Sequence, residues 1–199
     1  MKKSQLLVIV GSLLLLSLFF FPLWNIMIGA PQYPIPLGMD IWINKIVGVE
    51  PNDIQNIDLM NHYVGMEPIP KEMPEFKIFP IVIITMSILG VIVGILGKPK
   101  FYFVWLAIMV LLGVVGMYDF YLWEYDYGHN LDPHAAIQFV DDAGNPMAYQ
   151  PPLFGTTYIL NFDAHSYPST GAYLMAAGMT LVGLGWLLGL KENKNNVHV

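Results

Sequence analysis

The sequence contains no cysteine and no arginine, and only 12% of its 199 residues are charged. Without cysteine the chain cannot form disulfides, thiolate metal sites, iron–sulfur clusters, covalent haem attachments or a cysteine nucleophile. A formal charge of −6, with 9 lysines in no basic cluster, argues against a nucleic-acid-binding surface, which needs cations to neutralise phosphates. Soluble domains carry about 25% charged residues, so the composition also excludes an ordinary soluble enzyme. Metal or redox chemistry would have to use His, Met, Asp, Glu, Tyr or backbone oxygen.

Apolar residues are what the sequence has in excess: 55% of residues are hydrophobic and the mean hydropathy is +0.53. A helix needs about 20 mostly apolar residues to cross a hydrocarbon layer about 30 Å thick. Four segments meet this requirement, at about 5–28, 78–96, 101–122 and 171–190. The first apolar run exceeds the usual length of a signal-peptide core, about 7–15 residues, so we expect an uncleaved anchor. We predict an all-α membrane protein, a single domain (1–199) built as a four-transmembrane-helix bundle with a small exterior cap.

The lysines are distributed asymmetrically about these spans. Those at the two chain ends and in the tight second turn fall on one side: Lys2, Lys3, Lys98, Lys100, Lys191 and Lys194. The positive-inside rule makes that side cytoplasmic. We therefore expect a bacterial inner-membrane protein with both termini in the cytoplasm and the long loops 29–77 and 123–170 in the periplasm. Together with Asp119, these loops hold fourteen of the fifteen acidic residues, four of the five histidines and three lysines.

The two outer loops supply about 95 residues, enough for one small cap but too few for two domains. Apolar residues at spacings of three and four predict a short amphipathic helix over 51–66, on which Asp58, His62 and Met66 share a stripe. Runs rich in β-branched and aromatic residues, 136–140 and 156–162, predict short strands. We therefore expect an α+β cap formed by both loops.

Histidines in the outer loops, with carboxylates beside them, are the feature that most resembles a chemical site. Imidazole and carboxylate are the commonest metal ligands other than thiolate, and a lysine-poor acidic surface concentrates cations. The candidate metal ligands are His62, Met66, Asp126, His129, Asp132, His134, Asp163 and His165. Their spacing matches no established metal motif, and an ordinary hydrogen-bonded role is the competing interpretation for each histidine. Imidazole with thioether suits copper, whereas imidazole with several carboxylates suits zinc, iron or manganese.

Two further acidic residues near the end of the third span, Asp119 and Glu124, are expected at a polar rim or an interface. A carboxylate at the edge of the hydrocarbon is costly unless it is hydrated or paired, so Asp119 marks either a functional site or a polar contact between helices. The aromatic residues between Tyr118 and Tyr127 predict an interfacial belt, with a stacking site as the alternative. Glycines four apart, at 90 and 94 and at 185 and 189, predict close helix packing within the chain, with a dimer seam as the alternative.

Four outer segments carry a resemblance to a known family: Ala30–Pro34, Asn61–Met66, Gly128–His134 and Asp163–Ser166. In these segments the chain resembles small multi-span membrane proteins encoded in bacterial nitrous oxide reductase gene clusters. The resemblance implies an accessory role: assembling, supplying with copper or anchoring an exported copper enzyme of denitrification. It assigns no role to any residue. The lack of cysteine and of nucleotide-binding glycine motifs excludes the lipid-anchored copper chaperone and the transporter ATPase of those clusters.

The sequence leaves two main functional hypotheses. In the first, the cap of a membrane accessory protein binds a transition metal through His62, His129, His134 and His165 and serves an exported metalloenzyme, with copper preferred because of the resemblance. In the second, the chain is a structural or docking subunit of a respiratory membrane complex without bound metal, and its acidic cap meets a basic partner. An enzyme, such as a metal oxygenase, is disfavoured because no nucleophile–base arrangement is visible. A transporter is disfavoured because no charged residue lies at mid-membrane.

Overall fold

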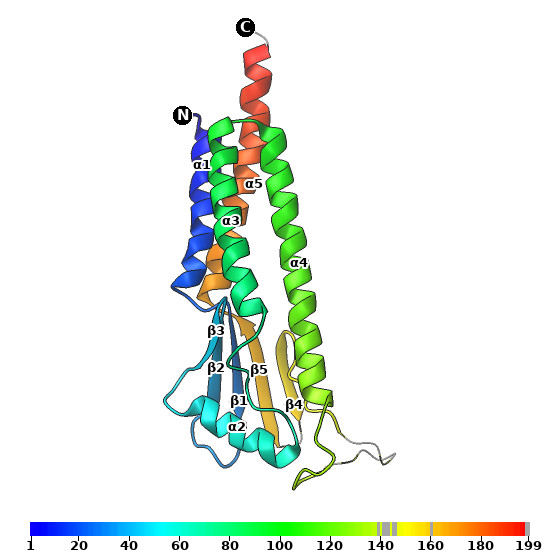
Figure 1. Ribbon diagram of the computed structural model, residues 1–199. Coiled ribbons are helices and arrows are strands. Elements are labelled where there is room, and N and C mark those ends of the chain that lie inside the picture. The colour runs from blue at the N-terminus through cyan, green and yellow to red at the C-terminus, as the bar shows by residue number, and fades with distance from the viewer. Residues whose placement is uncertain (139, 141–143, 145–146, 160, 198–199) are drawn as a thin grey trace.

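The computed structural model describes residues 1–138, 140, 144, 147–159 and 161–197, without the side chains of residues 159 and 195–197. Three of its helices are long and apolar enough to cross a membrane, α3 (Glu75–Leu96), α4 (Pro99–His129) and α5 (Thr170–Val197), and they run side by side (Figure 1). In α4 the stretch between Lys100 and Asp119 contains no charged residue and is about 28 Å long at 1.5 Å per residue. This length matches the thickness of the hydrocarbon layer. The last three predicted spans are therefore all helices.

The first predicted span, 5–28, is wrong in its second half. An α-helix, α1 (Lys3–Leu13), continues as a 3-10 helix, η1 (Leu14–Phe19), and the chain then enters a strand, β1 (Trp24–Gly29). Pro22 lies between the helix and the strand, where it cannot supply a helical N–H. The apolar run 24–28 misled the prediction because a buried strand and a buried helix share that pattern. The helical part, Lys3–Phe19, is shorter than the other three helices, although the larger rise of its 3-10 turns brings its length to about 28 Å.

The fold is not all-α, because the outer segments form a five-stranded antiparallel sheet with the order β3-β2-β1-β5-β4. The outer segment between η1 and α3 contributes β1, β2 (Leu37–Trp42) and β3 (Lys45–Gly48). The outer segment between α4 and α5 contributes β4 (Gly155–Ile159) and β5 (Phe162–Pro168). Because β1 pairs with both β2 and β5, the two segments form one continuous layer at one end of the helices (Figure 1). The expected α+β cap is thus present, with more strand than the sequence predicted.

The other predictions for the cap have mixed outcomes. The amphipathic helix expected over 51–66 is α2 (Asp53–Val64), and the strand expected over 156–162 overlaps β4 and the start of β5. The strand expected over 136–140 is not found in residues 136–138 and 140, and residue 139 lies outside the described residues. The second outer loop was predicted to begin at 123, but α4 continues as a helix to His129. Most of the predicted turn at 141–145 lies outside the described residues.

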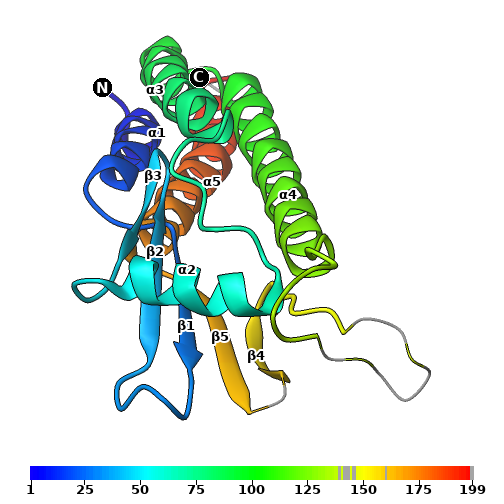
Figure 2. The same cartoon turned by 60° about the horizontal axis from the view of Figure 1, so that its bottom comes forward.

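One face of the sheet is covered by α2 and by the last turns of α4 (Figure 2). Trp24 and Ile26 of β1 are buried on this face with Ile57 of α2. The Trp24 ring meets Phe120 of α4 edge-on, with the ring centroids 5.8 Å apart, and its indole N–H donates to the buried Ser166 hydroxyl at 2.7 Å. The ring contact joins the cap to α4, whereas the hydrogen bond joins β1 to β5 within the sheet. Alternate strand residues point to the opposite face, which neither α2 nor α4 covers.

Glycines bring α1 close to its neighbouring helices. Gly11 of α1 faces Gly178 of α5, and a Cβ added to either residue would lie 2.5 Å from the carbonyl oxygen of the other. Gly90 and Gly94 of α3 and Gly185 of α5 also pack against α1. The small residues therefore serve packing within the chain, as expected, since lateral contact in a membrane depends on close backbone approach.

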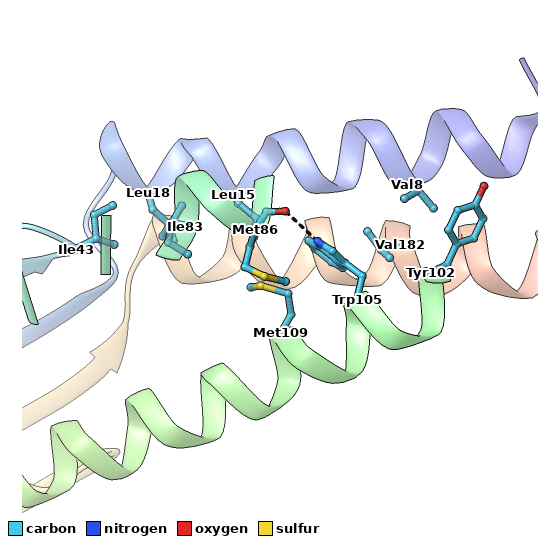
Figure 3. Close-up of a cluster of buried hydrophobic side chains, with 10 residues drawn as sticks. All are labelled: Val8, Leu15, Leu18, Ile43, Ile83, Met86, Tyr102, Trp105, Met109 and Val182. Carbon is cyan, nitrogen blue, oxygen red and sulfur yellow. Dashed lines mark hydrogen bonds between the residues drawn. The ribbon is translucent and has the colours of Figure 1, made fainter. Parts of the chain in front are cut away.

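The interior between the helices is filled by a hydrophobic cluster, which Figure 3 shows in close-up. Trp105 of α4 is buried there, and its indole N–H donates to the backbone carbonyl of Met86 of α3 at 2.9 Å. Met86 and Met109 lie beside this ring in Figure 3. A buried indole needs such an acceptor, so this bond fixes α4 against α3 at mid-bundle.

Candidate functional site

A pocket of about 370 Å³ lies between the C-terminal end of α2 and the segment that follows α4. It is lined by His62, Gly65, Met66, Glu67, Asn130, Leu131, Asp132 and Pro133. We call it the distal pocket, because it lies at the end of α4 farthest from the helix bundle. Three of the predicted metal ligands, His62, Met66 and Asp132, are thus brought to one pocket from both outer segments.

The distal pocket is held together by the end of α2. The helix ends at Gly65, which adopts a φ of +82°, a left-handed conformation that favours glycine. The Gly65 carbonyl accepts a hydrogen bond from the backbone N–H of Asp132 at 2.8 Å. A Cβ at position 65 would lie 2.8 Å from the Asp132 carbonyl oxygen, so only glycine permits this approach. One hydrogen bond therefore sets the position of Asp132 relative to His62 and Met66.

Asp132 also forms a turn, as the competing interpretation of this residue supposed. One of its carboxylate oxygens accepts the backbone N–H of His134 at 2.8 Å, and Pro133 lies between the two residues. The second oxygen has no hydrogen-bond partner among the residues that the structure describes. His134 itself is exposed and is not among the residues that line the pocket.

His129 occupies the last turn of α4 and is engaged with its own helix. Its ring stacks on Tyr125, with the centroids 4.0 Å apart and the planes inclined by 19°. Its Nδ1 lies 2.8 Å from the Tyr125 carbonyl oxygen, which can only accept, so Nδ1 carries the proton. This leaves Nε2 as the nitrogen that could bind a metal, but His129 does not line the distal pocket.

His165 lies on the face of the sheet that α2 does not cover. Its Nε2 is 2.7 Å from Asp163 Oδ2, and its Nδ1 is 2.8 Å from Thr156 Oγ1 of β4. Gly29 of β1 makes this possible, because a Cβ there would collide with the Asp163 carboxylate. Both ring nitrogens are occupied, so His165 could bind a metal only by giving up one of these bonds.

The four outer histidines therefore do not converge as the sequence analysis expected. Among the residues that the structure describes, no group of three or more His, Asp or Glu residues is arranged to hold a metal ion. Methionine is outside that set, and the distal pocket adds the thioether of Met66. The pocket also adds Glu67, which the sequence analysis missed, although its position directly after Met66 was a usable signal.

A second, smaller pocket of about 220 Å³ adjoins the first on the side of the helix bundle, and we call it the proximal pocket. Its lining residues are Glu67, Pro70, Met73, Trp123, Asp126, Tyr127 and Asn130, so the two pockets share Glu67 and Asn130. Asp126, predicted as a ligand beside His129, faces this pocket instead. The two pockets adjoin along the end of α4, and the proximal pocket is the more apolar of the two.

The two expected rim carboxylates have different environments. Asp119 is half-buried near Glu75 of α3, where the apolar parts of α3 and α4 end. Glu124 lies beyond that level, in the part of α4 that packs on the cap. It is fully buried, and among the described residues neither of its oxygens has a hydrogen-bond partner. Burial raises the pKa of the Glu124 carboxyl from 4.5 to about 8, so it is a neutral acid at pH 7.

No family model matches the chain, and a search of characterised proteins finds no significantly similar sequence. The distal pocket offers an imidazole, a thioether and two carboxylates at a solvent-accessible position, which together are a mixed set of transition-metal ligands.

Proposed function

We propose that the chain is a membrane accessory protein that binds a transition metal ion in the distal pocket. The proposed ligands are His62, Met66, Glu67 and Asp132, and copper is the preferred ion, with zinc, iron and manganese as the alternatives. The observation that carries the proposal is that ligands from both outer segments line one pocket, joined by the hydrogen bond between Gly65 and Asp132. His129, His134 and His165, which lie outside this lining, are not part of the proposed set.

The pocket suits transient rather than permanent binding. His62 and Glu67 are exposed, Met66 is half-buried, and their side chains are not preassembled around a point. An ion would draw them together on binding, and the free energy spent on ordering them would weaken its retention. A protein that supplies metal to an exported enzyme needs this property. The resemblance noted in the sequence makes nitrous oxide reductase the candidate recipient.

The proposed topology follows from the helices and the lysines. We propose that α1 with η1 forms a fourth crossing beside α3, α4 and α5, that both termini lie in the cytoplasm, and that the cap lies in the periplasm of a bacterial inner membrane. The arrangement of the helices supports this, since the start of α1, the end of α5 and the turn between α3 and α4 lie at the end of the bundle away from the sheet (Figure 1).

Metal analysis of the purified full chain tests the proposal. After loading with Cu(I), Cu(II) or Zn(II) and dialysis, we expect bound metal in the unmodified protein and a loss of affinity of at least about tenfold in His62→Ala and Met66→Leu. His134→Ala is the matched control, because it removes an exposed histidine of the same cap that does not line the pocket. Absence of metal above background, or equal losses in His62→Ala and His134→Ala, would refute the assignment.

A second candidate function is a docking subunit of a respiratory membrane complex without metal. The observation that favours it is the engagement of His129 and His165 in hydrogen bonds and stacking, which is the structural role expected of such histidines. In this case the acidic cap should hold a basic partner during purification at low salt and release it at high salt, because screening weakens exposed charge pairs. Metal content would then be at background throughout.

A further inference from the structure

The proximal pocket has a wall formed by two aromatic rings. Trp123 and Tyr127, one turn apart on α4, stack with their centroids 5.1 Å apart and their planes inclined by 23°. The Tyr127 hydroxyl accepts a hydrogen bond from the side-chain amide of the buried Asn61 on α2, which fixes the ring. Pro70 and Met73 complete the apolar part of the lining. The pocket therefore presents an aromatic surface on the side of α4.

The same pocket is negatively charged. The carboxylates of Glu67 and Asp126 line it, and no ion pair in the described part of the chain engages either residue. Asp58 of α2 adds a third negative charge close to Tyr127, while one of its oxygens accepts the backbone N–H of Ile69 at 2.7 Å. The field of these carboxylates attracts a cation into the pocket.

The size and chemistry of the lining favour an organic cation over a metal ion. The volume of about 220 Å³ is several times the roughly 30 Å³ that a water molecule occupies in the liquid. The lining contains no imidazole, and a bare ion would leave most of the space unfilled. An ammonium group placed against an aromatic face, with carboxylates beside it, uses both the charge and the ring quadrupole.

The height of the pocket matches the head-group layer of a membrane. Asp119 of α4 lies near Glu75 of α3, and the apolar stretches of both helices end there. Trp123 is one turn further along α4, about 6 Å beyond that level. The head-group region on each side of the hydrocarbon is about 5–7 Å thick, so the Trp123 end of the pocket lies within it.

We propose that the proximal pocket binds the ammonium end of a zwitterionic phospholipid head group from the leaflet on the cap side of the membrane. Glu67 lines both pockets, but this site differs from the proposed metal site in using the rings of Trp123 and Tyr127 and the carboxylate of Asp126, none of which lines the distal pocket. Bound lipid would hold the last turns of α4 and the Glu67 segment at a set height above the bilayer.

Lipid competition on the purified full chain tests this proposal. The protein in maltoside micelles is offered equal amounts of phosphatidylethanolamine, phosphatidylcholine and phosphatidylglycerol, and retained lipid is counted by native mass spectrometry. We expect preferential retention of the two ammonium lipids, reduced about tenfold in Trp123→Leu and preserved in Trp123→Phe, which keeps an aromatic face. Asp126→Asn should also weaken retention, whereas Glu50→Gln, which removes an exposed carboxylate of the same cap that lines neither pocket, should leave it unaltered.

Choline chloride, titrated in ligand-observed NMR, separates a lipid site from a site for a free amine. We expect choline to bind weakly and to compete with the ammonium lipids for the same pocket. Binding of choline without a preference among the lipids would overturn the head-group assignment. Equal retention of ammonium lipids by Trp123→Leu and the unmodified chain, at matched melting temperatures, would refute the proximal pocket as the lipid-binding site. The metal measurements use other variants, so either proposal can fail alone.

Discussion

Replacing Glu124 by glutamine should abolish a pH dependence that the unmodified protein carries. Glu124 lies on α4 one turn after Phe120, which contacts Trp24, and one turn before Gly128, where a Cβ would collide with the backbone of Gln150. The carboxyl is therefore enclosed between α4 and the cap, and neither oxygen has a hydrogen-bond partner in the part of the chain that the structure describes. A charge there would face an apolar surrounding without compensation, which is why the acid stays protonated.

The magnitude follows from the change of the pKa. Burial raises the pKa of Glu124 from 4.5 to about 8, so between these values the folded protein holds a proton that the unfolded chain has lost. The free energy of unfolding then falls by about 1.4 kcal/mol for each unit of rising pH, because the folded state binds one proton more than the unfolded state. Over the whole window the loss is about 5 kcal/mol. The contribution is fully present below pH 4.5 and fully lost once the pH exceeds 8.

Hydrogen exchange measures this effect where it arises. The opening free energy of the α4 amides from 119 to 129, corrected for intrinsic exchange, should decrease between pH 5 and pH 8 in the unmodified chain. In Glu124→Gln it should stay level, since an amide does not ionise in this range. Glu67→Gln is the matched control, because Glu67 is an exposed glutamate of the same cap and should keep the unmodified slope. Parallel slopes for the unmodified chain and Glu124→Gln would refute the reasoning.

Three further predictions concern packing and topology. Gly11→Ala should lower the melting temperature strongly, because its Cβ would overlap the backbone of α5. Gly113→Ala should not lower it, because its Cβ meets nothing within 4 Å. Equal effects of the two changes would contradict the packing of α1 against α5. Trp24→Phe should cost about 1–3 kcal/mol in denaturant unfolding, because it leaves a buried serine without its donor; no measurable cost would argue against that bond. Since the chain has no cysteine, Gln55→Cys should react with an impermeant maleimide added to spheroplasts and Asn193→Cys only after lysis, and the reverse pattern would invert the proposed topology.

Local patterns of the sequence were sufficient for the elements whose signal is periodic or continuous. The helix over 53–64 was predicted from the spacing of its apolar residues, and α3, α4 and α5 from uncharged runs of membrane length. The strand at 24–29 was missed because the apolar run of α1 continues into it, and only pairing with β2 and β5 shows that these residues are extended. A strand at this position differs from a helix by its hydrogen bonds to neighbouring strands, and the local sequence does not show those neighbours.

The candidate ligands were predicted by residue type but only partly by position. His62, Met66 and Asp132 meet at one pocket, whereas His165 lies on the other face of the sheet with both ring nitrogens bonded. The stacking of His129 on Tyr125 could have been inferred from their spacing of four on a helix, had α4 been extended beyond 122. The burial of Glu124 could not have been inferred from the sequence, because it depends on contacts between segments far apart in the chain.

The sequence by itself determined that the chain is rich in membrane-length apolar helices, that thiol chemistry is absent, and that acids and histidines are concentrated in two outer segments. Those properties follow from composition and local spacing, which require no partner. Only the tertiary structure decided that the outer segments share one sheet, that His62 lines a pocket, and that the Glu124 carboxyl is buried. These outcomes depend on contacts between residues distant in sequence, where a hydrogen bond such as that of Gly65 with Asp132 sets the geometry.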